Sequence, residues 1–109
     1  MDINESDLNL DVFKNKRIII FGGTTCWVNK MREKLPQAIF ISLNSKNPKL
    51  NFIDQYGYIF INTNINQNFY YKIKSITNKM NVNYYYIKNY DNINYSLKEM
   101  IDVVKNTNK

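Results

Sequence analysis

Hydrophobic residues follow two alternating patterns along this chain, short continuous runs and rows with helical spacing. Four runs at 17–21, 38–43, 58–61 and 84–87 are rich in β-branched and aromatic residues, as in strands buried on both faces. Apolar residues at helical spacing predict helices over 26–35, 66–79 and 92–106. Residues 45–55 remain ambiguous, because Pro48 interrupts any helix there.

This alternation predicts an α/β fold, a small three-layer domain of the Rossmann-like or flavodoxin-like kind with a four-stranded parallel sheet. Strands separated by helical crossovers lie parallel in one sheet, and we expect the strand order 2-1-3-4. A chain of 109 residues suits one domain. We place this domain at 15–109, after a loosely ordered acidic arm at 1–14 in which one helical turn packs Leu8 and Val12 back.

The residues that follow the predicted strands are small and polar, at 22–25, 44–45, 62–64 and 88–89. Ligands of doubly wound domains bind beyond the carboxyl ends of the strands. Gly22 and Gly23 are two of only three glycines in the chain, and they join the first strand to the first helix. Glycine lets the backbone approach an anion, and the N–H groups at a helix start point toward it. The turn therefore predicts a site for a phosphorylated or nucleotide-like ligand.

This turn also has a purely structural explanation, in which Thr24 caps the helix. Both explanations stay open, because the turn matches neither the full dinucleotide fingerprint nor the ending of a phosphate loop. A second candidate group lies at the start of the helix at 66–79. Amide side chains at this positively charged helix end could bind a base or a ribose. A capped helix with solvated lysines would have the same sequence pattern. The predicted ligand-binding residues are Gly22, Gly23, Thr24, Thr25, Asn62, Asn64, Asn66, Tyr70 and Lys72.

Nothing in the chain requires catalysis, and we predict no catalytic residue, no metal site and no cofactor. The chain contains no histidine, the commonest general base and metal ligand. Cys26 and Arg32 have the Cys-x5-Arg spacing of phosphotyrosine-phosphatase loops. Trp27 and Met31 between them have the spacing of a packed helix face, so we expect Cys26 to be a buried or half-buried structural residue.

The net charge of +6 suggests an alternative function, a basic module that binds nucleic acid or a protein partner. Its contacts would come from Lys30, Lys34, Lys72 and Lys74. The basic residues are spread over every predicted helix, however, and the many Asn, Lys, Ile and Tyr residues match an AT-rich coding sequence. The tyrosines at 84–86 could stack on bases, but in a sheet covered on both faces they become core or edge residues.

Two further expectations concern location and assembly. No apolar run approaches the roughly 20 residues of a membrane span, residues 1–5 lack the features of a secretory signal, and the single cysteine excludes an internal disulfide. We therefore expect a cytoplasmic protein that does not contact membranes. A shallow strand-end rim and a supply of nine tyrosines and six phenylalanines favour a homodimer.

Several short motifs carry a resemblance to a known family: residues 17–23, Trp27, Lys30, Leu35-Pro36, Asn62-Thr63-Asn64 and Tyr70-Tyr71-Lys72. Over residues 16–104 the chain resembles a family of small bacterial and phage domains of uncharacterised function with a Rossmann-like fold. Members often have Ser-His before the helix predicted here at 66–79, and this chain has Asn66-Gln67-Asn68 in that place instead. The resemblance therefore implies the fold and a strand-end pocket more than an activity. Together with the small size, it suggests non-catalytic binding of a nucleotide-like molecule, as in a phage protein that sequesters a host nucleotide signal.

Overall fold

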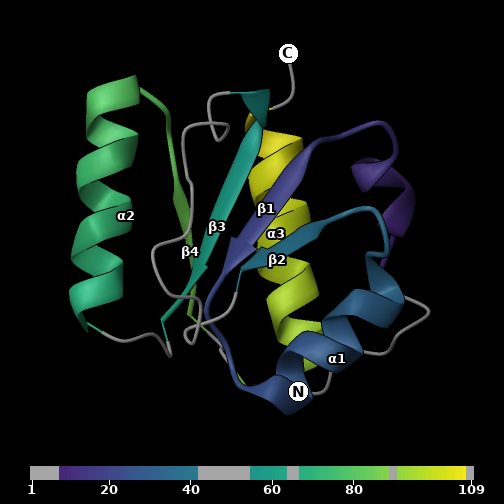
Figure 1. Cartoon of the computed structure of the whole chain (residues 1–109). Helices are drawn as coiled ribbons and strands as arrows, with labels where there is room; N and C mark the ends of the chain where they lie inside the picture. The colour runs from purple at the N-terminus through teal and green to yellow at the C-terminus, as the bar shows by residue number, and fades with distance from the viewer. Residues whose placement is uncertain (1–7, 42–54, 64–66, 89–90, 108–109) are drawn as a thin grey trace.

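The computed structural model describes residues 8–41, 55–63, 67–88 and 91–107, and it confirms the predicted α/β class (Figure 1). Each predicted helix and strand begins and ends within one residue of its predicted position, apart from the end of β2, where the described residues stop. The elements in chain order are η2 (Leu10–Phe13), β1 (Ile18–Phe21), α1 (Thr25–Lys34), β2 (Ile39–Ile41), β3 (Tyr58–Asn62), α2 (Gln67–Met80), β4 (Tyr85–Ile87) and α3 (Ile93–Thr107).

The four strands form one parallel sheet in the order β2-β1-β3-β4, which confirms the predicted order. In the register of the sheet, Ile20 lies between Phe40 of β2 and Phe60 of β3. Every residue of β1 is buried. This explains why β1 is a continuous apolar run, since a central strand of a covered sheet has no solvent-facing side.

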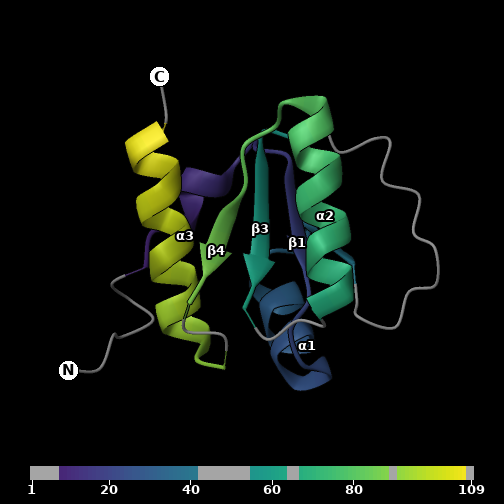
Figure 2. The same cartoon turned by 90° about the vertical axis from the view of Figure 1, so that its left-hand side faces the viewer.

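Side-chain alternation along the strands divides the core into two parts. Ile18, Ile20 and Phe60 pack with η2, α1 and α3, whereas Ile19 and Ile61 belong to the opposite part with α2. Figure 2 shows α3 on one side of the sheet and α2 on the other. The domain therefore has three layers, as predicted.

The helices bury the rows of residues that their spacing predicts. In α2, Ile73 is buried, and Phe69, Ile76 and Met80 pack against the same part of the core. In α3 the buried apolar residues are Leu97, Met100, Ile101 and Val104. Among the helices of the described residues, none combines the length and the apolar character that a membrane crossing requires.

The chain before β1 contributes to the core within the described residues. The turn η2 ends in Phe13, whose side chain is fully buried, and Leu8 and Val12 pack against the same part of the core. Asn9 caps this turn, because its side-chain oxygen accepts a hydrogen bond from the Asp11 N–H group at 3.1 Å. Residues 8–13 of the predicted arm are thus packed on the domain, and its residues 1–7 lie outside the described residues.

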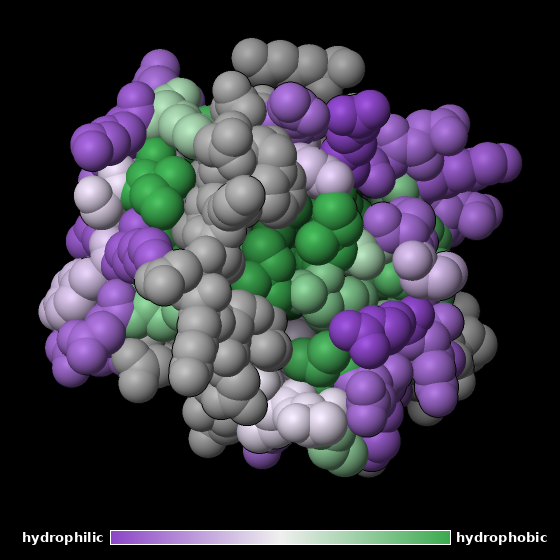
Figure 3. Space-filling view, viewed as in Figure 1, coloured by the Kyte–Doolittle hydropathy of each residue, from purple (hydrophilic) through white to green (hydrophobic). Residues whose placement is uncertain are grey.

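The face that carries α2 is less completely covered by the described helices than the face that carries α1 and α3. In Figure 3, apolar side chains gather over β1 and β2 on this face, with polar side chains around them. Ile39 and Ile41 of β2 are only partly buried there. Since α2 lies toward the β4 edge of the sheet in Figure 1, side chains of α2 and β4 can meet at the carboxyl ends of the strands.

Candidate functional site

The Gly22-Gly23 turn is buried, and a protein side chain occupies the space beside it. Both glycines have positive φ angles, 84° and 92°. A Cβ atom at Gly23 would lie 2.5 Å from Cε3 of Trp27 and 3.2 Å from Nδ2 of Asn62. The Gly22 N–H group donates to the Ile41 carbonyl oxygen at 3.0 Å. The glycines therefore allow a tight turn and the close approach of an indole ring.

The capping role of Thr24, left open by the sequence, is confirmed. Its hydroxyl oxygen accepts a hydrogen bond from the Trp27 N–H group at 3.2 Å, and its carbonyl oxygen accepts one from Val28 at 2.9 Å. The indole nitrogen of Trp27 donates to the Ser96 hydroxyl oxygen at 3.1 Å and so joins α1 to α3. These contacts give the first turn of α1 a structural role.

The predicted site residues around this turn fall into two groups. Gly22, Gly23 and Asn62 are buried, so none of them faces solvent. Thr24 and Thr25 are exposed at the start of α1. The structure thus places these five residues near one another in the fold but leaves only the two threonines accessible to a ligand.

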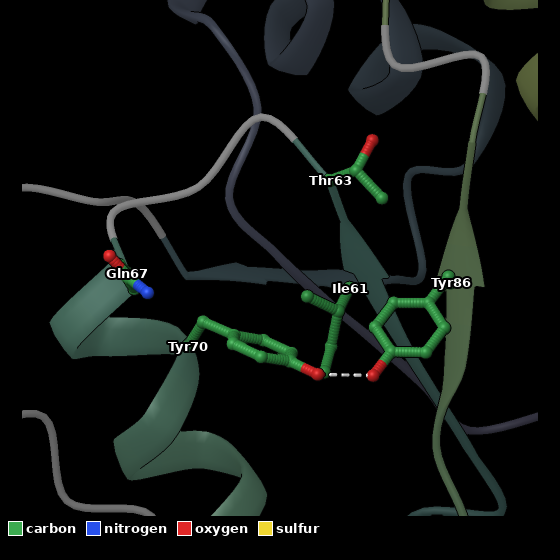
Figure 4. A pocket seen from close by; sticks show the side chains of 5 residues that line it. All are labelled: Ile61, Thr63, Gln67, Tyr70 and Tyr86. Carbon is green, nitrogen blue, oxygen red and sulfur yellow. Dashed lines mark hydrogen bonds between the residues drawn. The ribbon is translucent and has the colours of Figure 1, made fainter.

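A pocket of about 250 Å³ lies at the carboxyl end of β3, between α2 and β4 (Figure 4). Five side chains line this tyrosine pocket: Ile61, Thr63, Gln67, Tyr70 and Tyr86. Strand β3 and the residue after it supply Ile61 and Thr63, β4 supplies Tyr86, and the start of α2 supplies the other two. The pocket is at the strand ends, where doubly wound domains bind ligands, but beside β3 and β4 and not at the glycine turn.

Two tyrosine rings form the walls of the tyrosine pocket. Tyr70 and Tyr86 approach from α2 and β4, with ring centroids 6.0 Å apart and planes tilted by 44°. Their hydroxyl groups are hydrogen-bonded to each other, as Figure 4 shows. The Thr63 hydroxyl donates to the Ile87 carbonyl oxygen at 3.2 Å, which holds Thr63 against β4. Apolar walls with a few fixed polar groups are typical of small-molecule sites.

The hydrogen bond between Tyr86 and Tyr70 raises the pKa of Tyr86 well above the ordinary value of a phenol, and burial and the neighbouring Tyr84 raise it further. Tyr86 therefore stays protonated at neutral pH. Its hydroxyl group can donate or accept a hydrogen bond, but it does not act as a base there.

Replacing Tyr70 by Phe should lower the pKa of Tyr86 toward about 10, the ordinary value, because the largest cause of the upward shift is removed. A raised pKa means that the folded state holds the proton more tightly than the unfolded state. The contribution of the pair to stability is therefore present below about pH 10 and is lost as pH rises above it. Carbon NMR of ring-labelled tyrosine across alkaline pH measures this titration.

Tyr85→Phe is the matched control for this titration, because Tyr85 is not among the groups that shift the pKa of Tyr86. The Tyr85→Phe variant should show the same titration curve for Tyr86 as the unmodified protein. If Tyr70→Phe also left the curve unchanged, the hydrogen bond would not be the cause of the shift.

Of the residues predicted on α2, Tyr70 lines the tyrosine pocket and Lys72 does not. Two residues along a helix correspond to a turn of about 200°, so Lys72 is exposed on a different side of α2. Lys74 is seven residues after Gln67 and shares its side of the helix. Asn64 and Asn66 lie outside the described residues, as do the predicted rim residues at 44–45 and 89.

The predicted ligand-binding residues do not include Ile61, Thr63, Gln67 or Tyr86, although Thr63 belongs to the predicted polar rim at 62–64 and Gln67 to the candidate group at the helix start. Their neighbours in the sequence could have indicated two of them. Thr63 stands between two asparagines that were predicted for the site, and Gln67 directly follows Asn66. Tyr86 alternates with Tyr85 on an edge strand, which turns its ring toward α2.

The prediction that Cys26 is buried or half-buried is wrong, because its side chain is exposed. Trp27 and Met31 of the same helix face the core. Cys26 is one residue before Trp27 and therefore lies about 100° away from it around the helix axis. Arg32 lies on the same helix, with its guanidinium group 5.4 Å from the centroid of the Phe40 ring. Within the described part of the chain, no three His, Cys, Asp or Glu side chains are grouped so that they could hold a metal ion.

Comparisons with protein-family models, with curated proteins and with solved structures found no match.

Proposed function

We propose that this domain binds a nucleotide-like small molecule without changing it chemically, with the flat heterocyclic base in the tyrosine pocket. The observation that carries the proposal is the pair of hydrogen-bonded rings of Tyr70 and Tyr86 at the strand ends. Aromatic side chains stack on the faces of bases and contribute about 1–3 kcal/mol per base. This site shares only Tyr70 with the residues predicted from the sequence.

The polar groups of the pocket suit the edge of a base. The hydroxyl groups of Tyr70 and Tyr86 line the pocket, and the raised pKa of Tyr86 keeps its own hydroxyl group protonated at neutral pH. They offer donors and acceptors, and the Gln67 amide adds both kinds at the start of α2, where it also donates to the Tyr71 hydroxyl oxygen at 3.2 Å. A base has such groups along its edge.

The size of the pocket indicates which part of the ligand it holds. About 250 Å³ is below the roughly 300–1,000 Å³ of typical drug-sized sites, so the pocket suits a base and leaves the sugar and phosphate outside. The start of α2 carries partial positive charge and lies at the same edge, which favours a phosphate there. A binder of this kind acts by sequestration, which in a phage-type protein would remove a host nucleotide signal.

Binding of the four nucleoside monophosphates, measured separately by titration calorimetry, tests the proposal. At least one should bind saturably, whereas ribose 5-phosphate, which lacks the base, should not. Tyr86→Leu should weaken that binding about tenfold or more, because a stacking surface is lost. Tyr95→Leu is the control, since Tyr95 lies on α3 and does not line the pocket.

Two outcomes would reject this function: no saturable binding of any monophosphate, or binding that Tyr86→Leu leaves unchanged. Circular dichroism of each variant establishes that it is folded. Native mass spectrometry of the same samples reports the subunit count, and we propose a cytoplasmic homodimer, because a second copy over the open rim would enclose more of the ligand.

A further inference from the structure

A second pocket lies between β4 and α3, and it shares Tyr86 with the tyrosine pocket. This edge pocket has a volume of about 390 Å³. It is lined by Tyr84, Tyr85, Tyr86, Lys88, Glu99, Asp102 and Val103, from β4, the residues next to it and α3. Tyr86 lines both pockets, so the two cavities adjoin at this residue.

Four tyrosine rings form a continuous row across these pockets, in the order Tyr71, Tyr70, Tyr86 and Tyr84. Neighbouring ring centroids are 5.6, 6.0 and 5.6 Å apart. In the described part of the chain, the large hydrophobic side chains that are exposed are Tyr71, at 55%, and Tyr86, at 39%. Both belong to this row. An exposed aromatic surface next to two cavities marks a ligand site longer than one ring.

Two lysines lie beside the tyrosine row. Lys74 follows Tyr71 by three residues and shares its side of α2. Lys88 follows Tyr86 by two residues and lines the edge pocket. Both lysines are exposed. Phosphates of a ligand that runs along the row would therefore meet positive charge.

The two carboxylates that line the edge pocket have partners within the protein. Oε2 of Glu99 accepts a hydrogen bond from the Lys88 N–H group at 2.7 Å. Asp102 forms an ion pair with Lys98, with a distance of 2.8 Å between Oδ1 and Nζ. Lys98 offsets the charge of Asp102, whereas the hydrogen bond from the neutral backbone N–H group of Lys88 holds Glu99 in place without offsetting its charge.

We propose that the ligand contains two bases joined by a phosphodiester, with one base in each of the two pockets that Tyr86 borders. This proposal rests on the proposed function, because the first base occupies the tyrosine pocket. The second base occupies the edge pocket beside Tyr84 and Tyr85, and the phosphodiester passes from one pocket to the other near Lys88. A free dinucleotide and a single strand of nucleic acid both supply this chemistry.

The experiment compares a monophosphate, the linear dinucleotide of the same base and a longer single strand of that base, all at one salt concentration and then all at a higher one. The dinucleotide should bind at least tenfold tighter than the monophosphate. Lys88→Gln should reduce the affinity for the dinucleotide severalfold and leave the monophosphate unaffected. Lys105→Gln is the matched control, because this exposed lysine of α3 lines neither pocket.

The outcomes separate the two proposals. A monophosphate that binds as tightly as the dinucleotide overturns the two-base ligand but leaves the proposed function intact, whereas failure of all three ligands overturns both. A longer strand that binds more tightly than the dinucleotide, with an affinity that falls steeply with salt, identifies single-stranded nucleic acid as the source. Equal affinities for the dinucleotide and the longer strand identify a free dinucleotide.

Discussion

Gly23→Ala should lower the free energy of unfolding by about 2–5 kcal/mol. The new Cβ atom would lie 2.5 Å from Cε3 and 2.9 Å from Cζ3 of Trp27, so the ring has to move. Trp27 is buried and donates a hydrogen bond to Ser96, and its movement therefore disturbs α3 as well as α1. The φ angle of +92° at Gly23 adds backbone strain for any residue with a side chain. Urea unfolding measures the effect.

Gly57→Ala is the matched control for this variant. A Cβ atom at Gly57 meets nothing within 4 Å, so the change in stability should stay within about 0.5 kcal/mol. Equal stabilities of the two alanine variants would show that the Trp27 ring does not constrain the turn. In that case the ligand-based explanation of the glycine pair would regain its support.

Phe13→Ala should destabilise the domain by about 3–5 kcal/mol, because a fully buried ring leaves a cavity in the core. Phe13 belongs to the part of the core formed with α1 and α3, although it lies before the first strand. Thermal unfolding followed by circular dichroism measures the loss as a lower transition temperature.

Asp11→Ala serves as the control, since Asp11 is exposed in the same turn. Its side chain leaves no cavity, and the hydrogen bond between Asn9 and residue 11 uses the backbone N–H group. A Phe13 variant as stable as the Asp11 variant would mean that η2 is not part of the cooperative unit.

The fold was predictable because strands buried on both faces and helices packed on one side both leave regular patterns. The run 17–21 has no polar residue after Arg17, and α2 repeats Phe69, Ile73, Ile76 and Met80 at helical spacing. Phe13 lacked such a signal, because a turn of four residues is too short to show a period. Its burial depends on α3, which is distant in the sequence.

The candidate site was predictable in its position at the strand ends and in Tyr70, but not in its other members. Gly23 indicated a close approach of another group, and a sequence does not distinguish a ligand from an indole ring four residues further on. Tyr70 contacts Tyr86 because of the way α2 crosses β4. The hydrophobic period of either element does not specify this crossing. Cys26 was misplaced because the buried row of α1 begins one residue later.

The packing of η2 against α3 has a consequence for the order in which the domain folds during synthesis. Both central strands and α2 precede α3 in the chain, so the face of the sheet under α2 is complete in sequence before α3 is made. The opposite face, with Phe13, waits for α3, and its apolar side chains stay exposed on the nascent chain until that helix leaves the ribosome. A chaperone that recognises this intermediate would therefore bind the α3 side and be released when α3 docks.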